Sequence, residues 1–178
     1  MPVPFARWLA TAERLQLQTA FADMQQRLEE VPAEQVLHIE KNIRTGSHTF
    51  GTADQPRITW VEDRKGSLTF TGGSVVSGAG ILVIPQIVRL QNVTLYWQGI
   101  IVLLDAGDLQ VTGPNVCGHI IGAIVIQDDS VSDRKLDFDR VTRSSTCTPL
   151  SVNYSCEAVL RALTLLQRTL SWTEQFDV

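Results

Sequence analysis

The chain has 178 residues, a formal net charge of −4 at pH 7 and only 19% charged residues, against the roughly 25% typical of soluble domains. Its length suits one domain with its own hydrophobic core, and the stretch from Gly66 to Gln127, where only Arg89, Asp105 and Asp108 carry charge, is too apolar for a disordered linker. The acidic balance without a Lys/Arg run argues against a nucleic-acid groove, and no apolar run approaches the roughly 20 residues that span a bilayer.

Residues 1–45 form the first predicted unit, an N-terminal helical segment. Apolar side chains recur at intervals of three and four from Phe5 to Val31 among good helix formers, and Pro32 ends or kinks the run. We therefore expect a helix over residues 4–36. It packs on its own domain, as amphipathic helices usually do, or it binds a partner and offers a route to oligomers.

Residues 46–150 form the second predicted unit, in which short bursts of Val, Ile and Thr replace the helix formers. Between these bursts lie segments that alternate apolar and polar residues, the pattern of a strand with one buried face, at 67–70, 93–96, 108–111 and 135–138. Three of the bursts begin with glycine, and a fourth precedes them at a similar distance. The bursts are Arg57-Ile-Thr-Trp-Val61, Gly80-Ile-Leu-Val-Ile84, Gly99-Ile-Ile-Val-Leu103 and Gly122-Ala-Ile-Val-Ile126.

A repeat of about 20 residues, made of short strands and Gly or Asn turns, is typical of a solenoid. Stacked rungs share one core, and low charge is expected because neighbouring strands would hold like charges about 4.8 Å apart. An up-and-down barrel would need hairpin turns of the Asn-Gly or Asp-Gly type, and neither dipeptide occurs. We therefore predict a mainly β protein, a right-handed parallel β-solenoid (β-helix) of about four rungs.

Residues 151–178 form the last predicted unit, a C-terminal capping helix and a tail strand. Apolar spacing over residues 156–166 predicts a helix, and Ser155 is a plausible N-cap. We expect this helix to cover the end of the solenoid, where core and strand edges would otherwise be exposed. Residues 169–176 predict a short strand that ends the chain.

The cysteines and histidines offer little chemistry, and we predict a protein that is not an enzyme and holds no cofactor or metal. Cys117 and His119 form a Cys-x-His pair, which has too few ligands for a structural zinc site, and both are core side chains if they face inward. Cys147 and Cys156 are a candidate disulfide because the loop between them is short enough to close. Buried free thiols are the alternative.

A charged segment follows the last glycine-led burst. Its carboxylates alternate with Lys and Arg, which is typical of a solvated edge, although carboxylate pairs also act as acid, base or metal ligand in glycan-cleaving β-helices. Together with exposed aromatic residues such as Trp97, the segment is a candidate surface for binding. Its carboxylates are Asp128, Asp129, Asp133, Asp137 and Asp139.

The repeat and the tail resemble the PilX-type proteins of bacterial type IV pilus assembly, over about residues 56–174. This resemblance implies a non-enzymatic minor pilin or adhesive module of the cell envelope or extracellular surface, whose partners are other pilus and envelope proteins or surface glycans. The residues that carry it are Gly99-Ile-Ile-Val-Leu-Leu-Asp-Ala-Gly-Asp-Leu-Gln-Val-Thr-Gly113, Tyr154-Ser-Cys-Glu-Ala-Val-Leu-Arg-Ala-Leu163 and Leu170-Ser-Trp-Thr-Glu174.

Two other functions stay open at this point. The charge-poor rungs also suit a self-assembling scaffold like the bactofilins, whose short β-helices stack end to end, although a capping helix would block one end. The charged segment suits a carbohydrate-binding or carbohydrate-active β-helix. The first residues lack the pattern of a signal peptide, so we expect a soluble chain that is cytosolic unless such a segment precedes it.

Overall fold

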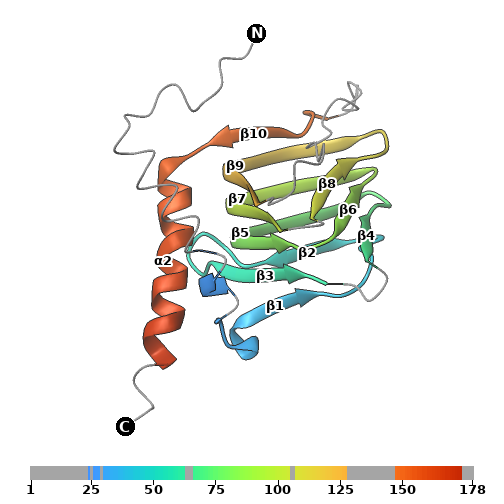
Figure 1. The fold of residues 1–178 in the computed structure, drawn as a ribbon. Helices are drawn as coiled ribbons and strands as arrows, with labels where there is room; N and C mark the ends of the chain where they lie inside the picture. The colour runs from blue at the N-terminus through green and yellow to red at the C-terminus, as the bar shows by residue number, and fades with distance from the viewer. Residues whose placement is uncertain are drawn as a thin grey trace.

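The computed structural model describes residues 24–127 and 147–173, apart from residues 25, 29, 63–65 and 105–106. It shows a mainly β protein in which parallel strands stack into a solenoid of about four turns, with one long helix beside them (Figure 1). The elements in chain order are η2 (Ala33–Gln35), β1 (Val36–Ile39), β2 (Ser47–Phe50), β3 (Arg57–Val61), β4 (Ser67–Phe70), β5 (Ser74–Ile84), β6 (Ile87–Leu90), β7 (Val93–Leu104), β8 (Asp108–Val111), β9 (Val116–Gln127), β10 (Ser151–Tyr154) and α2 (Cys156–Thr173).

Two parallel sheets face each other across the solenoid. The large sheet has the strand order β1-β3-β5-β7-β9-β10, with β2 also paired to β5, and the small sheet has the order β4-β6-β8. Parallel neighbours cannot be joined by a hairpin, and the chain passes through the small sheet after β3, β5 and β7 before it returns to the large sheet. One long bent strand and one short strand thus make up the rungs of β5–β6 and β7–β8.

A ladder of glycines marks the bend in each long strand. Gly80, Gly99 and Gly122 are paired in register across β5, β7 and β9, at φ of +112°, +134° and +142°. The residues that follow each glycine are also paired in register, and the burst at β3 pairs with the one in β5. The predicted stacking of the four apolar bursts is thus confirmed.

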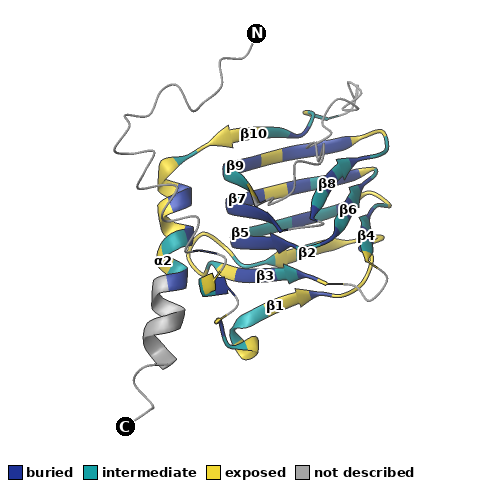
Figure 2. Ribbon diagram, in the orientation of Figure 1, coloured by how far each residue is buried: buried dark blue, intermediate teal, exposed yellow. Residues whose placement is uncertain are grey.

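Alternate residues of the long strands enter two separate hydrophobic clusters. Leu82 and Ile101 point between the two sheets, whereas Ile81 and Ile100 point outward from the large sheet. Both sets are buried. The parts of β5 and β7 that follow the glycine ladder are accordingly dark in Figure 2. The outward set therefore needs a cover, which α2 and the described residues near Met24 provide.

The position of α2 corrects the predicted cap. The helix packs across β5, β7 and β9 on the outer face of the large sheet and runs beside the stack instead of over its end (Figure 1). Its apolar face, including Val159 and Ala162, meets the outward cluster, and this burial outweighs the benefit of covering a strand edge. The backbone N–H of Ala158 donates to Ser155 Oγ at 3.3 Å, which confirms the predicted N-cap.

The helix also continues to Thr173, so the predicted tail strand is wrong over residues 169–173. The sequence between Ser155 and Thr173 contains neither Gly nor Pro, so nothing there interrupts a helix that is already packed. Residues 174–178 lie outside the described part of the chain.

Only the last part of the predicted N-terminal helix falls within the described residues. Met24 and residues 26–28 are helical, and Met24, Leu28 and Val31 are buried in the outward cluster with α2. The helix ends before Pro32, and β1 already pairs with β3, so the solenoid begins at Val36 and not at residue 46 as expected. The predicted helix before residue 24 lies outside the described residues.

The small sheet differs from the predicted set of alternating strands. Residues 67–70 and 108–111 are β4 and β8, but the strand between them is β6, which is not among the predicted strands. Residues 93–96, expected in this set, are instead the first part of β7 in the large sheet. Residues 135–138 lie outside the described residues.

The disulfide of the structure joins Cys117 to Cys147, with Cα atoms 6.0 Å apart, and Cys156 is free and exposed. The candidate bridge between Cys147 and Cys156 is therefore wrong. Pairing of Ser151 with His119 sets β10 on β9, which places the preceding residues near Cys117 and carries Cys156 onward to the start of α2. The bridge fixes the last described strand to the rung below it.

We expect Cys147→Ser to lower the free energy of unfolding by about 3 kcal/mol, because the bond closes a loop between residues 30 apart in sequence. The matched control is Cys156→Ser, which removes the free, exposed thiol and should leave the melting temperature unchanged. Thermal unfolding without reductant measures both variants. Equal melting temperatures for the two would contradict a stabilising Cys117–Cys147 bond.

Candidate binding surface

The outer face of the large sheet has two halves. Past the glycine ladder the outward side chains are covered by α2, and before it the outward side chains of β2, β5, β7 and β9 include several that are exposed or half-buried (Figure 2). The change coincides with the bend in the long strands, because α2 packs on the apolar half. The open half is the candidate functional surface.

One ladder of outward side chains crosses this open half. Thr49, Ser77, Tyr96 and His119 are paired in register on four neighbouring strands. The rings of Tyr96 and His119 lie with centroids 4.8 Å apart and an interplanar angle of 59°. Small hydroxyl side chains thus lie on β2 and β5, and larger rings lie on β7 and β9. The surface is therefore lower over β2 and β5 than over β7 and β9.

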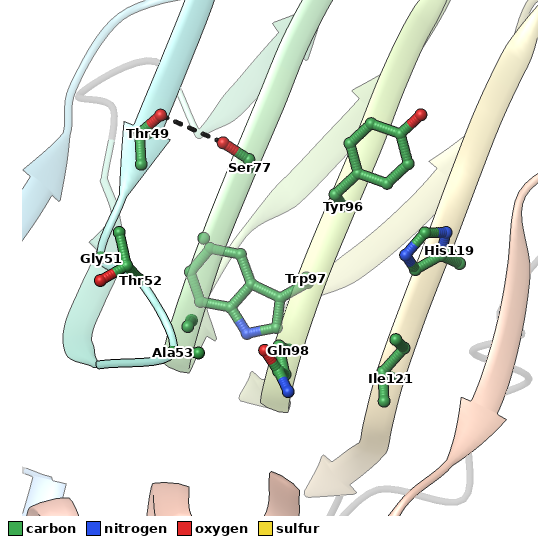
Figure 3. Close-up of a pocket in the computed structure, with 12 residues that line it drawn as sticks. Thr49, Gly51, Thr52, Ala53, Ser77, Tyr96, Trp97, Gln98, His119 and Ile121 are labelled. Atoms are coloured by element: carbon green, nitrogen blue, oxygen red, sulfur yellow. Dashed lines mark hydrogen bonds between the residues drawn. The ribbon is translucent and has the colours of Figure 1, made fainter. Parts of the chain in front are cut away.

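A hollow of about 260 Å³ lies at this step (Figure 3). Small side chains of β5, Ser77 and Ala79, leave its floor low, while Tyr96 and His119 rise on one side and the loop after β2 borders it on the other. The residues that line it are Thr49, Gly51, Thr52, Ala53, Ser77, Gly78, Ala79, Tyr96, Trp97, Gln98, His119 and Ile121.

Hydrogen bonds orient the two hydroxyls of the ladder. Ser77 Oγ donates to the carbonyl oxygen of His48 at 3.3 Å, and the oxygens of Thr49 and Ser77 lie 3.1 Å apart. A hydroxyl has one proton, so with Ser77 donating to the backbone, Thr49 donates to Ser77. Thr49 Oγ1 is then the oxygen of this pair that can accept a hydrogen bond from a ligand.

Trp97 is not an exposed aromatic residue. Its side chain is 1% exposed, points between the sheets, and its Nε1 donates to the carbonyl oxygen of Gly80 at 3.4 Å. Tyr96, one position earlier, takes the opposite face of the strand and is 39% exposed. The structure therefore replaces Trp97 by Tyr96 as the aromatic group of the surface.

The acidic candidates cannot be placed on this surface. Asp128, Asp129, Asp133, Asp137 and Asp139 all lie outside the described residues. The described chain stops at Gln127 and resumes at Cys147. The candidate surface is accordingly built from β2, the loop after it, β5, β7 and β9.

The Cys-x-His pair is divided between two roles. Cys117 and His119 both lie on the outward side of β9, but the sulfur of Cys117 is bonded to Cys147 and carries no thiolate for a metal. His119 instead packs against Tyr96. Across residues 24–127 and 147–173, with the gaps noted above, no three His, Cys, Asp or Glu side chains gather as a metal site would require.

The second tyrosine lies outside the hollow. Tyr154 is on β10 and is 47% exposed. Partial burial, and then the neighbouring Cys156, raise the pKa of its phenol above the ordinary value.

Comparisons with protein families, with curated proteins and with solved structures find no match for the chain. The fold and the surface therefore define its class, a parallel β-solenoid with a side-packed helix and a shallow polar hollow on its outer face. Among the helices of the described residues, none combines the length and apolar character that crossing a membrane requires.

Proposed function

We propose that the chain is a non-catalytic structural and adhesive β-solenoid module of a type IV pilus system or of the cell surface. The hollow on its outer face supports an adhesive role, because its described lining includes hydroxyl, amide, imidazole and aromatic groups suited to contact with a ligand. For the solenoid we further expect right-handed coiling, the hand that parallel crossover connections almost always take.

The observation that carries the proposal is the bond between Cys117 and Cys147. Disulfides form and persist in oxidising surroundings such as the bacterial periplasm and the cell surface, and they are rare in the cytosol. A bond that fixes the last described strand of the solenoid thus supports a place in the cell envelope or outside the cell. The proposed location follows from this chemistry and from the resemblance together.

Two of the three segments that carry the resemblance also have structural roles that fit a scaffold. Residues 99–113 run from the glycine ladder of β7 through β8, and so make up most of one rung. Residues 154–163 join the end of β10 to the part of α2 that packs on the sheet. Both motifs therefore specify how the solenoid is built, which supports a structural module.

Pilus association is tested in the bacterium that carries the gene, with the full-length protein. We expect the protein to be recovered with pili sheared from the cells, and to be lost from that fraction in a strain without the major pilin. The total amount of the protein in each strain is the control for expression. An unchanged distribution between the two strains would contradict the proposed association.

A second candidate function is end-to-end self-assembly, and the position of α2 favours it. The helix lies beside the stack, so it does not block a stacking end in the way that the predicted cap would. Within the described residues β1 and β10 each pair with a single strand, and they expose Leu37 and Val152. A molar mass that rises with concentration in sizing chromatography would support this alternative, and a constant monomer mass would remove it.

A further inference from the structure

The hollow beside Tyr96 has the chemistry of a site for a neutral, hydroxyl-rich ligand. Its described lining contains no Lys, Arg, Asp or Glu side chain, so it offers no permanently charged partner to a phosphate, a carboxylate or an amine. It does offer an aromatic face, a hydroxyl pair and the amide of Gln98. Such a mixture suits a ligand with both apolar C–H faces and many hydroxyl groups.

We propose that this hollow binds one ring of a neutral sugar, with the ring packed on Tyr96 and its hydroxyls bonded to Thr49 and Gln98. The volume of about 260 Å³ lies below the roughly 300–1,000 Å³ of drug-sized pockets, so one ring fits and the rest of a glycan extends into solvent. The inference deepens the proposed adhesive function and rests on it for the source of the sugar.

Tyr96 supplies the stacking surface. It is 39% exposed, and His119 packs against its ring at a centroid distance of 4.8 Å, which limits the orientations that the ring can take. A ring that is already held in place loses little conformational entropy when a ligand binds. The apolar C–H face of a sugar is then buried against a preorganised aromatic group.

Thr49 supplies a directed acceptor. A sugar hydroxyl that donates to Thr49 Oγ1 would extend the existing series in which Thr49 donates to Ser77 and Ser77 donates to the carbonyl of His48. Hydrogen bonds in such a series polarise and strengthen one another. The amide of Gln98, the next outward residue after Tyr96 on β7, can donate and accept in the same hollow.

The test uses the purified chain and four probes, the methyl glycosides of glucose, galactose, mannose and N-acetylglucosamine. Binding is followed by saturation-transfer NMR and by titration calorimetry. We expect at least one probe to bind, and Tyr96→Ala to weaken its binding about tenfold through the lost aromatic contact. The matched control is Tyr154→Ala, which removes the other tyrosine of the chain and should leave the affinity unchanged.

A second variant keeps the proposal testable if Tyr96→Ala fails to fold. Thr49→Val preserves the shape of the side chain and removes the acceptor, so it should weaken binding several-fold while leaving the circular dichroism spectrum unchanged. Binding of none of the four probes, or equal losses for Tyr96→Ala and Tyr154→Ala, would overturn the proposal. Either result would overturn sugar binding in the hollow and leave the proposed pilus association in place. That association is tested separately, by recovery of the protein with sheared pili.

Discussion

Gly99→Ala is expected to destabilise the protein by about 4 kcal/mol or more, which is a large fraction of the roughly 5–15 kcal/mol that stabilises a typical domain. A Cβ at this position would overlap the backbone carbonyl oxygen of Gly80 in the rung below, which cannot move without breaking the ladder. The residue also has φ of +134°, a conformation that a residue with a side chain rarely adopts. Steric overlap and backbone strain therefore add at one site.

The control for Gly99 is Gly66→Ala. Gly66 also has a positive φ, +75°, but a Cβ there would meet no atom within 4 Å. Gly66→Ala therefore measures only the cost of placing a side chain on a backbone with positive φ, which lowers the free energy of unfolding by about 1–2 kcal/mol. Urea unfolding followed by circular dichroism measures both. Similar losses for Gly99→Ala and Gly66→Ala would mean that the rungs do not approach closely at the glycine ladder.

Trp97→Ala is the second change with a large expected effect, a loss of about 3–5 kcal/mol, because the indole is 1% exposed and fills space between the sheets. Its neighbour in register is Gly78, where a Cβ would overlap the indole ring. Gly78→Ala should therefore destabilise the parent protein strongly and cost less in the Trp97→Ala background. A double-mutant cycle measures this coupling.

The matched control is Trp60→Ala on β3. Trp60 is only partly buried at the outward cluster, so its truncation should cost clearly less than that of Trp97. If the two tryptophans cost the same, or if Gly78→Ala costs as much with alanine at position 97 as with tryptophan, the packing of the indole against Gly78 would be contradicted.

The glycine-led bursts were predictable because their cause is local. A glycine that tolerates a positive φ recurs at the same bend in Gly80, Gly99 and Gly122, and the apolar residues after it recur with it. Each rung must repeat the geometry of the rung below if the backbones are to bond in register. The sequence repeat therefore records the structural repeat directly.

The small sheet was only partly predicted because alternating strands look alike in either sheet. A signal that separates them is the residue before each long strand, which has a positive φ at Gly73, Asn92 and Asn115. Glycine and asparagine are the residues that adopt this conformation most readily. Aligning the three positions places residues 93–96 in a long strand and leaves β6 for the small sheet.

The place of α2 was predicted wrongly, although the bursts held a signal for it. In β5 and β7 the residues after the glycine are apolar on both faces of the strand, and a sheet with one solvated face would alternate instead. Continuous apolar runs such as Ile100–Leu104 therefore required a second layer on the outer face. The amphipathic helix at the end of the chain was available to supply it.

The candidate surface depended on facts that the sequence does not contain. Which of Tyr96 and Trp97 points outward is set by the register of β7, and a shift of one residue would exchange them. The disulfide partner of Cys147 is set by the alignment of β10 on β9, which brings Cys117 close from a position 30 residues away. Neither alignment can be derived from spacing along the chain.

The location and oxidation state of the protein in living cells test the central claim most directly. Cells that make the full-length protein are treated with a thiol-alkylating reagent that does not cross the cytoplasmic membrane, and the protein is then analysed by mass spectrometry. We predict that the intact cells yield a chain alkylated at Cys156 alone, with Cys117 and Cys147 bonded to each other. A chain that is untouched in intact cells, and that carries three reactive thiols after lysis and denaturation, would contradict an envelope or surface module.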